Sequence, residues 1–215
     1  MPLDNRYFGE YATFRPANRD DGFALMGADN IIGDVYTIEF VSDGEDMLAW
    51  MVSRFDKRVG HFNANVSRRL NILRARGWTI RAVLSYVAFT TDEDEGYYWG
   101  EAGIIANDPR YDEAVGNFIA KIGDKLTRSQ RLDIDLGTSG VDQMIAANGD
   151  WLPSKVLGSP KLEKGSAVVK DSRSLNDAVV EEARKSNPGC YVASAVLVVV
   201  LIVVIVLIIK ACSGL

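Results

Sequence analysis

The stretch that decides the fold is residues 78–107, which read WTIRAVLSYVAFTTDEDEGYYWGEAGIIAN. Trp78 to Thr90 is a long run of β-branched and aromatic residues, and Tyr98 to Asn107 is a second such run. Both compositions favour extended strands. Thr91 to Gly96, between them, is acidic and ends in a glycine, which is typical of a turn. The stretch therefore predicts a β-hairpin.

The sequence before the hairpin predicts a strand and a long helix. Residues 34–41 alternate between two sets of strong β-formers, which indicates a strand. From Glu45 onward, apolar residues recur every three or four positions as far as Leu73, so we expect one amphipathic helix over residues 45–76. Gly60 lies in its middle, where the helix either bends or divides in two.

The sequence after the hairpin completes the predicted domain. Helical spacing returns over residues 111–126, residues 132–136 alternate as a short strand, and residues 141–147 form a last short helix. The order β-α-β-β-α-β is that of a ferredoxin-like sandwich. We therefore expect an α+β fold of this type, with an extra short C-terminal helix.

The predicted elements divide the chain into five segments. These are an N-terminal extension (1–33), a soluble α+β domain (34–151), a linker (152–189), a transmembrane helix (190–210) and a short far-side tail (211–215). The linker is rich in Ser, Gly, Pro and Lys. Within it, Ser174 is a suitable N-cap for a short helix over residues 174–185.

The apolar run from Tyr191 to Ile209 carries no charged residue. At 1.5 Å per residue, a helix of this length spans about 28 Å, close to the ~30 Å hydrocarbon core of a bilayer. Tyr191 and Lys210 suit the two membrane interfaces, where an aromatic ring or a snorkelling ammonium group is favoured. The run predicts a single-pass membrane protein.

The positive charges beside this run predict its orientation. Lys170, Arg173, Arg184 and Lys185 precede it, whereas Lys210 alone follows it. The positive-inside rule therefore places the N-terminal domain in the cytoplasm. The first residues lack the apolar core of a signal peptide, and the apolar run lies near the C-terminus, so we expect a tail-anchored protein.

Composition argues against several kinds of site. The chain has a net charge of −5, which disfavours general binding of nucleic acid. Its two cysteines, Cys190 and Cys212, flank the apolar run, so the soluble part has neither a disulfide nor a thiolate metal site. His61 is the only histidine, and its place in the predicted helix indicates packing or exposure rather than catalysis. We expect no cofactor.

One face of the predicted long helix is strongly basic. No acidic residue occurs between Lys57 and Thr91. Four arginines, which we treat as a candidate contact for an anionic surface, lie between its apolar positions: Arg68, Arg69, Arg74 and Arg76. Either they form a solvated face that pairs with the acidic turn at residues 92–95, or they contact an acidic partner. The anionic cytoplasmic leaflet is the nearest such partner.

A second candidate site lies at the predicted strand over residues 132–136. Asp133 and Asp135 project from the same face of that strand and could hold a divalent metal ion. The turn that follows, Gly137, Thr138, Ser139 and Gly140, could hold a phosphate group at a helix N-terminus. The same residues also fit an edge strand followed by an ordinary helix cap. No lysine follows the turn, so it is not a P-loop.

Two function hypotheses follow. The first is a membrane-tethered cytoplasmic interaction or regulatory domain, whose partners are the lipid bilayer, an unidentified protein and, at the arginine face, anionic lipid. The alternative is a membrane-associated enzyme that acts on a phosphorylated substrate with a divalent metal at Asp133 and Asp135. Nucleic acid is not an expected partner.

Overall fold

A computed structural model describes residues 4–44, 46–91, 96–162, 164–174 and 177 of the chain. The chain divides into two compact units, Met1–Arg173 and Ser174–Leu215. The first unit contains the fold described below.

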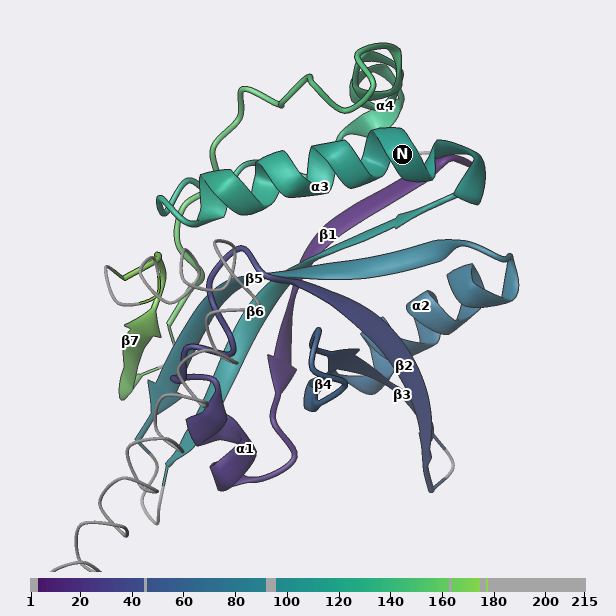
Figure 1. The fold of residues 1–215 in the computed structure, drawn as a ribbon. Helices are drawn as coiled ribbons and strands as arrows, with labels where there is room; N and C mark the ends of the chain where they lie inside the picture. The colour runs from purple at the N-terminus through teal and green to yellow at the C-terminus, as the bar shows by residue number, and fades with distance from the viewer. Residues whose placement is uncertain (1–3, 45, 92–95, 163, 175–176, 178–215) are drawn as a thin grey trace, which may run out of the picture. The chain divides into compact units, whose positions relative to one another are not determined.

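Six antiparallel strands of the first unit close into a barrel, and a seventh extends it (Figure 1). The sheet order is β2-β3-β4-β1-β6-β5-β7, and β2 also pairs with β5. The strands are β1 (Tyr7–Arg15), β2 (Val35–Asp43), β3 (Asp46–Val52), β4 (Arg58–Phe62), β5 (Thr79–Thr90), β6 (Tyr97–Asn107) and β7 (Ser166–Lys170). Long pairings build the barrel: β6 pairs along nearly all of β5 and with β1 from Tyr7 to Phe14.

Two short pairings close the barrel. Strand β1 meets β4 only at its end, where Phe14 faces Phe62 and Arg15 faces His61. Strand β2 meets β5 over three residue pairs in the first half of β5, whereas β7 pairs with the second half. The edge of β1 that lies opposite β6 is therefore free of a strand partner over residues 7–13, within the described part of the chain.

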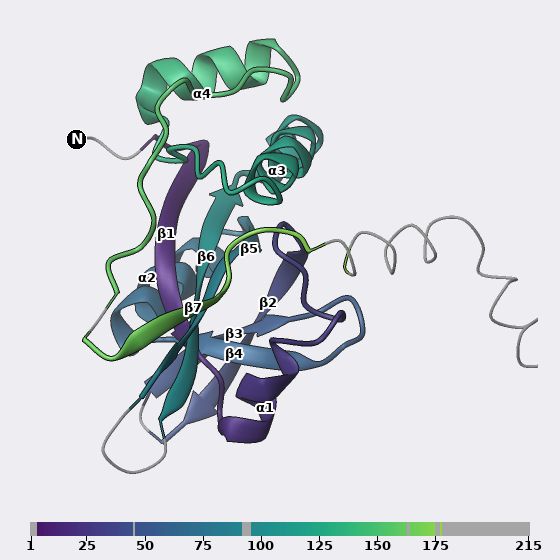
Figure 2. The same cartoon turned by 90° about the vertical axis from the view of Figure 1, so that its left-hand side faces the viewer.

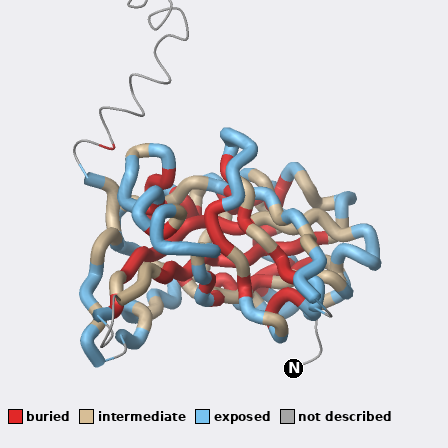
Figure 3. The backbone as a smooth tube through the Cα atoms, turned by 90° about the horizontal axis from the view of Figure 1, so that it is seen from below, coloured by how far each residue is buried: buried red, intermediate tan, exposed pale blue. Residues whose placement is uncertain are grey.

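Glycines allow the closure at Phe14. Its ring is 1% exposed and packs edge-to-face on Phe62, with ring centroids 6.3 Å apart. A Cβ atom on Gly60 would lie 2.6 Å from this ring, and one on Gly100 would lie 2.5 Å from it. Both glycines therefore provide the space that the ring fills, and the buried strands around it form the core (Figure 3).

Four α-helices and a short 3₁₀ helix accompany the sheet. Their bounds are α1 (Arg19–Ala24), α2 (Ala64–Ala75), η1 (Pro109–Tyr111), α3 (Asp112–Leu126) and α4 (Gly137–Ala146). Helices α3 and α4 lie together on one side of the barrel, and α1 lies on the opposite side (Figures 1 and 2). Phe118 of α3 packs on Tyr7 of β1 with ring centroids 6.2 Å apart, which anchors α3 to the sheet.

The predicted ferredoxin-like sandwich is wrong. The hairpin of β5 and β6 and the helix α3 are present near their predicted positions. However, residues 1–33 contribute β1, which lies between β4 and β6 in the barrel. The predicted strand at 132–136 is reduced to a single bridge between Leu132 and Val156. An open sandwich therefore does not form, because β1 and β2 supply the pairings that close the sheet.

The predicted helix over residues 45–76 is also wrong, because only its last part, α2, is helical. Strands β3 and β4 replace the rest, joined by a tight turn in which the Ser53 N–H donates to the Lys57 carbonyl oxygen at 2.9 Å. Asp56 takes the left-handed conformation in this turn, with φ of 57°. The apolar residues of β3 and β4 are mostly buried, so the pattern predicted burial correctly and conformation incorrectly.

The segment predicted as a linker contains β7, which pairs with β5 from Val87 to Thr90. Lys170 of β7 donates hydrogen bonds to the carbonyl oxygens of Met26, Gly27 and Asn30. Strand β7 is thus held at both the sheet and the loop after α1.

The second unit is described only at Ser174 and Asp177, which form the reciprocal hydrogen bonds of an N-cap. Within the described ranges, no helix is both long enough and apolar enough to cross a bilayer. The predicted span at 190–210, with Tyr191 and Lys210 at its ends, lies outside the described residues, as does the rest of the predicted helix at 174–185.

Candidate functional site: a groove along the first strand

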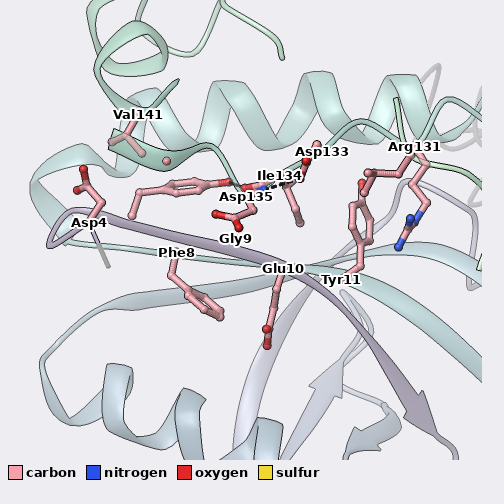
Figure 4. Close-up of a pocket in the computed structure, with 13 residues that line it drawn as sticks. Asp4, Phe8, Gly9, Glu10, Tyr11, Arg131, Asp133, Ile134, Asp135 and Val141 are labelled. Carbon is pink, nitrogen blue, oxygen red and sulfur yellow. Dashed lines mark hydrogen bonds between the residues drawn. The ribbon is translucent and has the colours of Figure 1, made fainter. Parts of the chain in front are cut away.

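A groove of about 510 Å³ runs along the partner-free edge of β1 (Figure 4). Its lining residues are Asp4, Tyr7, Phe8, Gly9, Glu10, Tyr11, Arg131, Asp133, Ile134, Asp135, Gly137, Val141 and Leu157. Successive side chains of a strand point to opposite faces. Because five consecutive residues of β1, from Tyr7 to Tyr11, line the groove, it follows the edge of the strand rather than one face.

The segment over residues 131–137 forms one wall of the groove, and two tyrosines of β1 hold it in place. The Tyr7 hydroxyl donates to the Ile134 carbonyl oxygen at 3.0 Å, and the Tyr11 hydroxyl donates to the Leu132 carbonyl oxygen at 2.9 Å. Between them, Gly9 lets the segment cross close to the strand, since a Cβ atom there would overlap the Ile134 carbonyl group. Burial raises the pKa of Tyr7 well above its usual value, so its hydroxyl remains a donor.

Four carboxylates line the groove, and three of them have a cationic partner. Asp4 binds Arg6, with atoms 2.8 Å apart, and this guanidinium lowers the pKa of Asp4. Glu10 binds Arg69 of α2 at 2.6 Å, yet burial raises the pKa of Glu10 above its usual value. Asp133 binds Lys155 at 2.7 Å.

The fourth carboxylate, Asp135, has no ion-pair partner among the described residues. Its backbone N–H donates to the Asp133 carboxylate at 3.1 Å, so the side chain itself is not held by that contact. Asp135 is therefore the groove carboxylate that is available to an added cation.

A buried ion pair lies at one end of the groove. Arg131 binds the Glu101 carboxylate through two hydrogen bonds of 2.8 and 2.9 Å, and its guanidinium lies 4.0 Å from the centre of the Tyr11 ring. The Glu101 side chain is 8% exposed and also accepts from Ser85 at 2.9 Å. Sequence reasoning missed this pair, because Glu101 and Arg131 come from distant elements and only the barrel brings them together.

The structure separates the residues of the predicted metal and phosphate site. Asp133 and Asp135 both line the groove, and Asp133 already binds Lys155. Of the predicted phosphate turn, Gly137 lines the groove, whereas Thr138, Ser139 and Gly140 belong to the first turn of α4. Among the described residues, no group of three or more potential ligands could hold a metal ion.

The predicted arginine face lies on α2 and is exposed. Arg69 pairs with Glu10 of the groove, and Arg74 lies over the Phe40 ring, 4.4 Å from its centre. Arg68 and Arg76 have no ion pair in the part of the chain that the structure describes. The acidic turn at 92–95, the alternative partner of these arginines, lies outside the described residues.

His61 is a packing residue in this structure. Its ring lies against Trp50 with ring centroids 4.8 Å apart, and its Nδ1 atom is 3.2 Å from the Phe62 carbonyl oxygen. Neither contact forms a catalytic arrangement.

Comparisons with known proteins give no further indication of function. No family model, no curated protein and no solved structure matches the chain.

Proposed function

We propose that the chain is a membrane-anchored interaction protein whose barrel domain binds an extended segment of a partner protein in the β1 groove. The observation that carries this proposal is the position of the groove along a strand edge that has no strand partner among the described residues. An unpaired edge offers backbone N–H and C=O groups to an added strand.

The groove has the dimensions of an added strand. At about 3.3 Å per residue, the partner-free part of β1 is roughly 20 Å long, enough for about six residues of an extended chain. The 131–137 segment lines it, and Glu10 of β1 pairs with Arg69 of α2. The two sides of β1 differ, because Phe8 and Glu10 point to one side whereas Asp133 and Asp135 lie on the other (Figure 4).

The charge of the groove specifies a basic partner segment. Asp135 lacks an ion-pair partner among the described residues, and the other three carboxylates each pair with one described cation. A lysine or arginine of the partner opposite Asp135 would complete the pairing. Such a contact contributes specificity more than affinity, because a partly exposed ion pair is screened by water.

The sequence supports anchoring of this domain in a membrane. The apolar run before Lys210 has the length of a span, and basic residues are concentrated on the side of the domain. We propose that the domain faces the cytoplasm. Carbonate extraction of the full chain and of a copy that stops at Gly189 tests the anchor: only the full chain should remain with the membrane.

Peptide selection tests the groove. The full chain in lipid nanodiscs would be panned against a random peptide library, and selected peptides would be mapped by amide hydrogen exchange. We expect enrichment of basic, β-forming sequences and slower exchange from Phe8 to Ala12. Asp135→Lys should abolish binding, whereas Asp43→Lys, an exposed aspartate at the end of β2, should not. Binding that is unaffected by Asp135→Lys and protects other segments would refute the proposed site.

The arginine face of α2 is a second proposed contact, with anionic lipid. It is supported by the exposure of Arg68, Arg69, Arg74 and Arg76 and by the lack of described ion pairs at three of them. Each cation near an anionic surface contributes about 1 kcal/mol. Replacing all four by serine should weaken binding of the 1–173 fragment to phosphatidylserine vesicles, with neutral vesicles as the control. Unchanged binding would remove this contact from the proposal.

A further inference from the structure

A second cavity, of about 210 Å³, lies beside the buried Glu101–Arg131 pair. Its polar lining includes Ser85, Tyr86, Arg131 and Asp171. A β-bulge between Leu84 and Tyr86 shifts the register of β5 against β6 at this point. Ser85 and Tyr86, although consecutive in the strand, therefore line the same cavity.

The Tyr86 hydroxyl group in this wall has no hydrogen-bond partner among the residues that the structure describes. Tyr86 is 3% exposed, and its hydroxyl is among the few buried side-chain polar atoms of the described residues that lack a partner. A buried hydroxyl group without a partner is unfavourable, because it loses its hydrogen bonds to water without replacement. Burial raises the pKa of Tyr86, and Asp171 and Glu101 raise it further, so the group stays protonated and can donate a hydrogen bond.

Donors and a carboxylate occur together around the cavity. Arg131 uses three of its nitrogen atoms on Glu101 and Gly158, and a guanidinium group has further N–H donors. Asp171 lines the cavity as well, and its carboxylate accepts from Ser172 but has no ion pair within the described ranges. Leu126, Leu157 and Pro160 supply apolar surface.

We propose that this cavity binds a free amino acid. Its carboxylate would accept hydrogen bonds from Tyr86 and Arg131, its ammonium group would pair with Asp171, and its side chain would lie against the leucines. The volume is that of a small molecule, below the range usual for drug-sized ligands. The site adjoins the groove, since Arg131 and Leu157 line both, but this proposal does not rest on the binding of a partner segment.

Thermal denaturation of the full chain in detergent, with each standard amino acid in turn, tests the proposal. We expect one or a few of them to raise the Tm in a saturable way, because a ligand that binds only the folded state stabilises it. The decarboxylated and deaminated analogues of an active compound should have no effect, since each lacks one of the two charged groups.

Two variants locate the binding. Tyr86→Phe removes the hydroxyl group, and Asp171→Asn removes the negative charge that holds the ammonium group. Each should weaken the affinity roughly tenfold or more, which corresponds to the loss of one good polar contact. The matched control is Tyr98→Phe, whose exposed hydroxyl contacts only the sulfur of Met26 among the described residues. It should leave the affinity unchanged.

The stability of Tyr86→Phe without ligand separates this site from a cavity filled by water. Because the hydroxyl has no partner within the described part of the chain, its removal should leave the Tm equal or higher. A lower Tm together with no response to any amino acid would assign the hydroxyl to ordered water and overturn the proposal. A response that persists undiminished in both variants would also overturn it.

Discussion

The hydroxyl group of Tyr7 donates a 3.0 Å hydrogen bond to the carbonyl oxygen of Ile134, which joins the first strand to a segment 127 residues later in the chain. The bond is buried, and Tyr7 itself is 4% exposed. This contact helps to position the wall of the groove, because among the described residues the 131–137 segment pairs with another segment only around the Leu132–Val156 bridge. The shape of the groove therefore depends on this side-chain hydrogen bond together with the backbone pairing of the segment to residues 155–157.

Replacing Tyr7 by phenylalanine should destabilise the 1–173 fragment by about 1–2 kcal/mol, because the Ile134 carbonyl group would be left buried without its donor. Urea denaturation measures this change. Tyr98→Phe is the control, since its hydroxyl is exposed, and should change the stability by less than about 0.5 kcal/mol. Equal effects of the two substitutions would show that the bond to Ile134 does not hold the segment.

Gly9→Ala should displace the same segment by steric overlap. The new Cβ atom would overlap the Ile134 carbonyl group and lie 2.6 Å from the Tyr7 hydroxyl oxygen. We expect the free energy of unfolding to fall by about 1–3 kcal/mol and amide exchange to become faster at residues 131–137. Gly158→Ala provides the matched control, because nothing lies within 4 Å of its added Cβ atom. A stable Gly9→Ala variant with unchanged exchange would contradict the close crossing.

Arg131→Met should be the most damaging of these substitutions. It removes the partner of a carboxylate whose side chain is only 8% exposed, and an uncompensated buried charge costs about 3–5 kcal/mol. Adding Glu101→Gln to the same chain should restore part of the loss, which a double-mutant cycle would measure.

The control for this prediction is Arg128→Met. Its ion pair with Asp124 joins side chains that are 65% and 58% exposed, so its removal should cost less than about 0.5 kcal/mol. If Arg131→Met were as mild as Arg128→Met, the Glu101 carboxylate would not depend on this guanidinium.

The β5–β6 hairpin and α3 could be predicted from the sequence because each has one dominant periodicity. Residues 79–90 and 97–107 are rich in β-formers without helical spacing, and residues 112–126 repeat apolar residues with helical spacing alone. The helix predicted over residues 46–62 is wrong because the apolar residues of β3 and β4 also fit a spacing of three to four residues. The turn between these strands contains no glycine, and Asp56 takes the left-handed conformation instead.

The groove could be predicted only in part. The pattern of paired carboxylates predicts a site at Asp133 and Asp135, and both residues line the groove. The sequence did not predict a role for Tyr7 and Tyr11 in a site, although the four aromatic residues within residues 7–14 favour a strand. The partner-free edge of β1 depends on which strands pair in the barrel, and no local pattern in the sequence encodes those pairings.

Two carboxylates of the groove should respond to pH in opposite directions. Arg6 lowers the pKa of Asp4 in the folded state, so the stability that Asp4 adds is present above its unfolded pKa near 4 and is lost as the pH falls through the folded value. Burial raises the pKa of Glu10, so its favourable contribution is complete below its unfolded pKa and is lost as the pH rises through the folded value.

Urea denaturation of the 1–173 fragment between about pH 2 and pH 7 tests both signs. The deficit of Asp4→Asn relative to the natural chain should be largest at neutral pH and vanish in acid. The free energy of unfolding of the natural chain, relative to that of Glu10→Gln, should be highest in acid. It should fall as the pH rises above about 4.3. If the two differences instead ran in the same direction, Arg69 rather than burial would control Glu10, and the groove would carry a more persistent negative charge.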